Sequence, residues 1–134
     1  MNRDEFATGR QANDEARDGL EITRRMATTA ARAAAGMFAK DVVIVDLREA
    51  VSYTDYFVVA SAETHRQTRR IVDEILEKMN EEGYRPRSRR VEEGSAWISQ
   101  DFLDIVVHIF TDEARDYYRL ESLWRAAPQE RWEE

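Results

Sequence analysis

Two unbroken apolar runs constrain the fold of this chain more than any other feature of its sequence. Val42–Val45 contains only β-branched residues, and Tyr56–Ala60 contains aromatic and β-branched residues followed by one alanine. Both runs have the length of a strand. They lack the alternation of apolar and polar residues that is typical of a strand with one solvent-exposed face. They therefore predict two strands that are buried on both faces of a sheet, the first of them over Val42–Leu47.

Helices are predicted before and after this pair of strands. The segment Ile22–Lys40 is rich in alanine, the best helix former, and its apolar residues recur at spacings of three and four. The residues on this apolar side are Met26, Ala30, Ala33 and Met37. A second helix is expected to begin at Thr64, which forms a capping box with Gln67, and to end at Gly83.

The second half of the chain predicts further strands and a short helix. Tyr84–Arg90 is extended but carries Pro86, which restricts it to a sheet edge or a loop. Ala96–Gln100 and Asp104–Phe110 form a hairpin, and Asp112–Tyr118 suits a short helix with acidic residues in its first turn. The order of elements indicates an α/β fold of the mixed α+β kind, a single domain with a mixed sheet flanked by helices.

The two ends of the chain differ in composition from its middle. Residues 1–21 mix polar and charged residues with few large apolar ones, so they can bury little surface to offset the entropy of ordering. The last ten residues are polar and charged around Trp132. We expect a flexible N-terminal segment at 1–21, a folded domain at 22–124 and a flexible C-terminal tail at 125–134.

Composition and charge exclude several classes of function. The chain has no cysteine and two histidines, which excludes disulfides, thiolate zinc sites and histidine-rich metal sites, so we expect neither a metal nor a cofactor. The net charge is −7, and residues 41–134 hold 13 basic against 21 acidic side chains. An acidic domain is poorly suited to wrapping nucleic acid but suits a basic protein partner.

The sequence also lacks the marks of a membrane or secreted protein. Its longest apolar runs have the length of strands, well short of the roughly 20 residues that a membrane helix needs. Its N-terminus is polar and does not look like a secretory signal. We therefore expect a cytoplasmic protein that makes no membrane contact.

Three ordered blocks of the sequence resemble the signatures of one protein family. The first block is Val42–Leu47 followed by Ser52–Val58, and Thr64–Gln67 resembles the start of the helix that comes next. The second block is Glu93–Gly94, Trp97–Ile98, Asp101 and Asp104–Phe110. The third block is Arg115–Trp124. Together they resemble the ribosomal silencing factor family, also called Iojap-like, from about Ile22 to Trp124.

The resemblance implies a nucleotidyltransferase-like fold without catalysis, so we expect no enzyme activity. It implies a ribosomal silencing factor that binds the large ribosomal subunit through large-subunit ribosomal protein fourteen. The bound factor then fills space that the small subunit needs, which blocks subunit association and represses translation. The resemblance also implies a homodimer off the ribosome.

Two residues depart from the family pattern. Tyr53 stands where the family usually has a smaller aliphatic residue, and Leu103 stands where it usually has glycine in the hairpin turn. Because leucine adopts positive φ less readily than glycine, we expect the turn geometry to differ here.

Partner-binding residues are expected in the hairpin and in the C-terminal part of the domain. Tyr117 and Tyr118 are adjacent, so they cannot both face one core from a helix. Tryptophan and tyrosine are also enriched at binding hot spots. The alternative for the aromatic residues is core packing. The candidate set is Trp97, Asp101, Asp104, Tyr117, Tyr118, Leu120, Glu121 and Trp124.

Other interpretations remain open. Asp55 and Asp104 lie near predicted strand ends, which would suit a nucleotide-binding enzyme, although Asp55 also suits a turn that accepts backbone amides. His108 suits a half-buried histidine better than a catalytic one. The chain could also be an oligomerisation domain alone, or a large-subunit assembly factor, since assembly needs the same docking.

One basic run stands out in this acidic chain. It consists of Arg85, Arg87, Arg89 and Arg90. A solvated sheet edge is the favoured interpretation, because charge on an edge deters strand addition. The alternative is a minor contact with ribosomal RNA, which would weaken steeply as salt is added.

Overall fold

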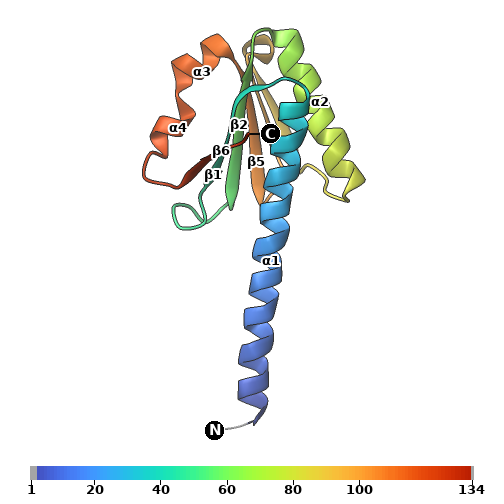
Figure 1. Cartoon of the computed structure of the whole chain (residues 1–134), viewed down its shortest axis with the longest axis vertical. Helices are drawn as coiled ribbons and strands as arrows, with labels where there is room; N and C mark the ends of the chain where they lie inside the picture. The colour runs from blue at the N-terminus through green and yellow to red at the C-terminus, as the bar shows by residue number, and fades with distance from the viewer. Residues whose placement is uncertain (1–2, 134) are drawn as a thin grey trace.

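The structure is a computed structural model that describes residues 3–133. Its centre is a six-stranded mixed sheet with helices on both faces (Figure 1). The strands are β1 (Lys40–Asp46), β2 (Tyr56–Ala62), β3 (Ser88–Glu92), β4 (Trp97–Asp101), β5 (Ile105–Thr111) and β6 (Gln129–Arg131). The helices are α1 (Arg3–Gly36), α2 (His65–Glu81), α3 (Asp112–Tyr118) and α4 (Leu120–Leu123), with a 3-10 turn, η1, at Glu93–Ser95. The predicted single-domain α+β fold with a mixed sheet is confirmed.

The sheet has the strand order β3-β4-β5-β2-β1-β6. β2 and β5 run parallel, whereas the other neighbouring pairs are antiparallel. Every residue of β2 is buried, and Val58 lies between Ile44 of β1 and Val107 of β5. The prediction of a strand buried on both faces is therefore confirmed for Tyr56–Ala60. β3 lies at the edge of the sheet, as the proline before it predicts.

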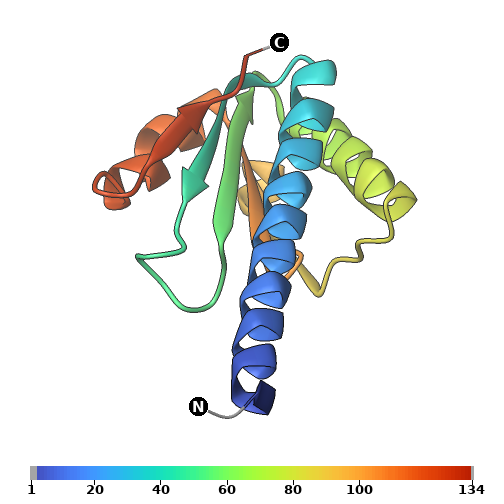
Figure 2. The same cartoon turned by 60° about the horizontal axis from the view of Figure 1, so that its bottom comes forward.

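α1 and α2 pack side by side on one face of the sheet (Figures 1 and 2). Their apolar side chains meet those of the strands in a buried core, which includes Met26, Ala30 and Ala33 of the predicted apolar side of α1. From α2, Ile71 and Ile75 lie fully buried in the same core. This face of the sheet is therefore closed to partners.

The predicted capping box at the start of α2 is present in a modified form. Thr64 Oγ1 accepts the N–H of Gln67 at 3.1 Å. Gln67 Oε1 accepts the N–H of Glu63, one residue before the cap, at 3.3 Å. Both bonds satisfy backbone amides that the helix itself cannot pair.

The first helix is longer than the sequence indicates. α1 begins at Arg3, although we expected residues 1–21 to be flexible, and its N-terminal half projects beyond the sheet (Figures 1 and 2). In the sequence, Arg10, Asp14, Arg17 and Glu21 follow one another at spacings of four, three and four, and opposite charges at these spacings favour a helix. The helix ends at Gly36 rather than Lys40, and Phe38 beyond it takes a left-handed backbone (φ 63°). No helix in the described chain is both long and apolar enough to cross a membrane.

The C-terminal segment forms a sheet edge where we expected a loose tail. β6 pairs antiparallel with β1, so that Arg131 lies opposite Val43. The Trp132 N–H donates to the Val42 carbonyl at 2.8 Å, and the indole packs against the core under α1 and α2. The polar composition of residues 125–134 does not reveal this pairing, because an edge strand hydrogen-bonds through its backbone. Residues 1, 2 and 134 of the predicted flexible ends lie outside the described residues.

The turn between β4 and β5 places Leu103 in the left-handed region, with φ 74°. Asp101 Oδ1 accepts the Leu103 N–H at 2.7 Å, and the Phe102 N–H donates to the Ile105 carbonyl at 2.9 Å. The turn thus keeps the positive φ that suits glycine, and leucine adopts it at a conformational cost.

Candidate docking surface

The face of the sheet away from α1 and α2 is partly open where β4 and β5 lie. Ile98 and Gln100 of β4 are buried on the covered side. The alternating residues Trp97, Ser99 and Asp101 are half-buried and lie on the other side. Because side chains alternate along a strand, this row is accessible to a partner.

α3 and α4 cover the adjoining part of this open side. Thr111 caps α3 by accepting the Ala114 N–H at 3.2 Å. Arg119, with φ 48°, turns the chain from α3 into α4. The buried residues of the resulting second core are Val45, Leu47, Phe57, Val59, Ala96, Phe110 and Ala114.

Aromatic rings gather where this second core meets the open row of β4. Trp97 stacks on Phe110 with ring centroids 4.9 Å apart, and its centroid lies 4.8 Å from that of Tyr118. Phe57 meets Trp124 edge-on, with centroids 6.2 Å apart. The structure thus brings together Trp97, Tyr118 and Trp124 of the predicted set. We call the following residues the aromatic face: Phe57, Trp97, His108, Phe110, Tyr118 and Trp124.

His108 supports Trp97 and is uncharged near neutral pH. Trp97 Nε1 donates to His108 Nδ1 at 3.1 Å, which places the imidazole proton on Nε2. The Nε2 atom is buried and has no hydrogen-bond partner among the described residues. Burial lowers the pKa of His108 to about 4. A general base works best with a pKa near the operating pH, so this histidine is suited to holding the indole rather than to catalysis.

Large apolar side chains stand exposed on the elements that carry the aromatic face. Tyr117 is 80% exposed, Leu123 is 72% exposed and Leu103 is 50% exposed. The adjacent tyrosines therefore do not share one core, as their positions on a helix predict. Sequence reasoning missed both leucines. For Leu123 the available signal was its spacing of three residues from Leu120.

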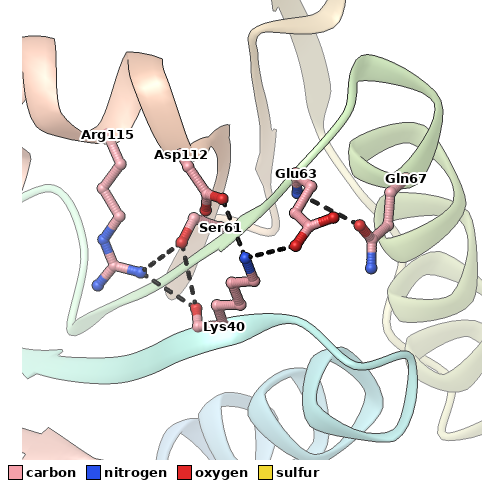
Figure 3. Close-up of polar contacts among 6 residues, drawn as sticks. All are labelled: Lys40, Ser61, Glu63, Gln67, Asp112 and Arg115. Carbon is pink, nitrogen blue, oxygen red and sulfur yellow. Dashed lines mark hydrogen bonds and ion pairs between the residues drawn. The ribbon is translucent and has the colours of Figure 1, made fainter.

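Arg115 links α3 to α4 and to the central strands. Its guanidinium is 12% exposed and pairs with Glu121 of α4 at 2.6 Å. It also donates to the Lys40 carbonyl at 3.2 Å and to Ser61 Oγ at 3.3 Å (Figure 3). Glu121 of the predicted set therefore holds α4 in place from within the fold.

Asp101 of the predicted set also has partners within the chain. Besides accepting the Leu103 N–H, its carboxylate pairs with Arg87 at 2.8 Å. This local pairing offsets part of the negative charge that a basic partner would meet. A contact of Asp101 or Glu121 with a partner therefore stays a prediction.

Lys40 lies at the carboxyl ends of the two parallel strands, β2 and β5. Its ammonium lies 3.0 Å from Glu63 after β2 and 3.1 Å from Asp112 after β5 (Figure 3). Hydrogen bonds to these two carboxylates raise the pKa of Lys40. Sheets with parallel strands bind their ligands at this end. Here the Lys40 side chain, which is 46% exposed, lies at that end with its two carboxylate partners.

Asp55 and Asp104 lie together, but at the amino ends of the parallel strands. The Asp55 N–H donates to the Asp104 carbonyl at 2.8 Å. Burial and the nearby Asp55 charge raise the pKa of Asp104. This is the end opposite to that at which such sheets bind ligands, so the pair fits a structural turn better than a nucleotide site. Among the side chains that the structure describes, there is no cluster of three or more potential metal ligands.

Comparisons with known proteins agree with this architecture. Residues 21–134 match the family described as ribosomal silencing factor during starvation. The chain is 31% identical over 90 residues to the ribosomal silencing factor RsfS of Bacillus subtilis, covering 67% of this chain and 76% of that protein. It is 29% identical over 89 residues to the mouse protein named mitochondrial assembly of ribosomal large subunit protein 1. This match covers 64% of this chain and 39% of the mouse protein. A crystal structure of a Chromobacterium violaceum protein aligns with a TM-score of 0.73 at 27% identity. The alignment covers 75% of this chain and 84% of that one.

Fold and surface together define a class of protein. It is a single-domain α+β protein whose open sheet face is aromatic and which holds a lysine between two carboxylates at the carboxyl ends of its parallel strands. The chain belongs to the ribosomal silencing factor family. The membership that the three sequence blocks predict is thereby confirmed.

Proposed function

We propose that this chain silences ribosomes by binding the large ribosomal subunit, on large-subunit ribosomal protein fourteen, through the accessible side chains on and around its aromatic face. The bound domain occupies space that the small subunit needs, so subunits do not associate and translation is repressed. The observation that carries the proposal is the exposure of Tyr117 and Leu123 beside the half-buried Trp97 and Trp124. Clustered large apolar side chains at a surface commonly mark a protein-binding site.

The proposed contact surface combines the predicted residues with two that the structure adds. Its centre is aromatic and aliphatic, and its rim is acidic, which suits a basic protein partner. The proposed contact residues are Trp97, Asp101, Leu103, Asp104, Tyr117, Tyr118, Leu120, Glu121, Leu123 and Trp124.

We also propose that the chain acts in the cytoplasm and forms a homodimer off the ribosome. In this state the two aromatic faces would cover each other, because self-association buries the same apolar side chains that the partner needs. Large subunits should then compete with dimerisation. A dimer that binds large subunits without dissociating would contradict this arrangement.

A role in assembly of the large subunit is the second candidate function. The name of the mouse relative, which refers to assembly of the large subunit, favours it. Both functions need the same docking, so binding alone does not separate them. Accumulation of incomplete large subunits in cells without the protein would favour assembly, whereas normal subunits that join too readily would favour silencing.

The docking surface can be tested with the double variant Tyr117→Ala/Leu123→Ala. Both side chains are exposed, so the variant should fold normally, and we expect its affinity for isolated large subunits to fall at least about tenfold. Phe38→Ala is the matched control, since Phe38 is 84% exposed in the turn after α1, outside the docking surface. Equal binding by the wild type and the double variant would contradict the proposed surface.

A further inference from the structure

Seven arginines lie on the first turns of α2, in the segment before the edge strand β3, and on β3 itself. All seven are exposed. They are Arg66, Arg69 and Arg70 of α2, Arg85 and Arg87 before β3, and Arg89 and Arg90 of β3. We call this set the arginine edge. Figure 1 shows α2 on the side of the molecule away from α3 and α4.

Two side-chain contacts connect α2 with the β3 region. Arg89 of β3 pairs with Asp73 of α2 at 3.1 Å. At the start of the helix, the His65 ring is hydrogen-bonded to the Gly94 carbonyl, just beyond β3. These bonds link the middle of α2 to β3 and the start of α2 to the 3-10 turn that follows β3. Arg69 precedes Asp73 by four residues and so lies on the same side of the helix.

The arginine edge concentrates positive charge in an acidic protein. The chain has 20 basic and 27 acidic residues, and seven of the 20 basic residues belong to the arginine edge. Three of the seven pair with one carboxylate each. The others form no ion pair with the part of the chain that the structure describes. Those four are Arg66, Arg69, Arg70 and Arg85.

Protection of the β3 edge does not account for all of these charges. Charged residues on an edge strand deter the addition of another strand, which explains Arg89 and Arg90. Arg69 and Arg70 belong to a helix, which has no strand edge to protect. Arg90 lies opposite Ser99, one of the β4 residues on the partner side. The arginine edge therefore adjoins the docking surface.

We propose that the arginine edge binds the phosphodiester backbone of ribosomal RNA while the aromatic face holds a ribosomal protein. This inference rests on the proposed docking to the large subunit, whose surface offers RNA next to protein. Guanidinium groups present several N–H donors in a fixed fork that matches phosphate oxygens, so clustered arginines suit a polyphosphate backbone. Contacts of this kind secure orientation without reading the base sequence.

The test compares Arg69→Gln/Arg70→Gln with a control, Arg25→Gln/Arg131→Gln. All four arginines are exposed, and each pair of substitutions changes the net charge equally. Affinity of the full chain for isolated large subunits is measured between about 50 and 200 mM salt. Each lost phosphate contact lowers the slope of log affinity against log salt by roughly 0.7–0.9. We expect a slope reduced by about 1–2 for the first variant and an unchanged slope for the control.

Protein-free large-subunit RNA at low salt identifies the partner. The proposal expects weaker RNA binding by Arg69→Gln/Arg70→Gln than by the control. A variant that loses affinity for subunits but not for free RNA would show an acidic protein as the partner and overturn the proposal. Unchanged affinity and slope on subunits would overturn it as well. If the wild type binds free RNA through these arginines but not subunits, the proposed docking fails while the RNA-binding surface stands.

Discussion

At the scale of single residues, Leu103 holds a backbone conformation that glycine adopts more readily. A left-handed residue with a side chain costs about 1–2 kcal/mol, whereas glycine adds about 0.5–1 kcal/mol of unfolded-state entropy. We therefore expect Leu103→Gly to raise the free energy of unfolding by about 0.5 kcal/mol, measured by urea titration. Leu103→Ala keeps the strained backbone and should not stabilise. A loss above about 1 kcal/mol with glycine would mean that the leucine side chain packs in the free protein.

His108 should make the fold sensitive to acid. Its pKa is about 4 in the folded protein and 6.5 as an ordinary histidine, so between these values the unfolded chain binds the extra proton. The His108 contribution to the free energy of unfolding therefore falls as pH decreases from 6.5 to 4, by up to about 3 kcal/mol. His108→Gln keeps an acceptor for Trp97 but cannot titrate. Urea titrations at pH 7 and pH 4.5 should show a smaller loss for this variant, and equal losses would contradict the assignment.

The sequence predicts the exposure of some residues of the candidate surface but not the ion pairs that others form. The adjacency of Tyr117 and Tyr118 predicts that one of them is exposed, because helical geometry separates neighbours. Nothing in the sequence shows that Asp101 binds Arg87, or that Glu121 binds Arg115, since these pairs form only once the hairpin and the C-terminal helices fold.

At the scale of elements, β6 differs most from what the sequence predicts, because it is a paired strand within the segment expected to be a flexible tail. Deleting residues 128–134 removes its backbone bonds to β1 and the packing of Trp132, so we expect the free energy of unfolding to fall by about 2–3 kcal/mol. The Asp46 amide, which donates to the Pro128 carbonyl at 2.8 Å, should also lose protection from hydrogen exchange. Deleting residues 133–134 is the control. Unchanged stability and exchange in the longer deletion would show a fraying tail instead.

The central elements could be predicted because their signals are local. The apolar run Tyr56–Ala60 is a strand, and the capping box at Thr64 starts a helix. The length of α1 and the pairing of β6 escaped prediction for different reasons. The first depends on charge spacing along a helix with few apolar residues, and the second on backbone bonds to a strand far away in the sequence.

At the scale of the whole molecule, the two sides of the sheet differ in how far helices cover them. α1 and α2 close one side with a core of aliphatic residues, and the other side keeps an aromatic surface next to an exposed arginine edge. The open face adjoins the exposed Tyr117 and Leu123 side chains, so it is the main candidate for contact with a partner. This arrangement suits the proposed action, in which the bound protein occupies space that the small subunit needs.

Subunit joining tests this central claim most directly. The purified chain is mixed with isolated large subunits, small subunits are added, and the mixture is separated on a sucrose gradient, with Tyr117→Ala/Leu123→Ala run in parallel. The account predicts that the wild-type chain migrates with large subunits and shrinks the peak of joined ribosomes, while the variant does neither. A wild-type chain that stays at the top of the gradient, with joining unaffected, would contradict it.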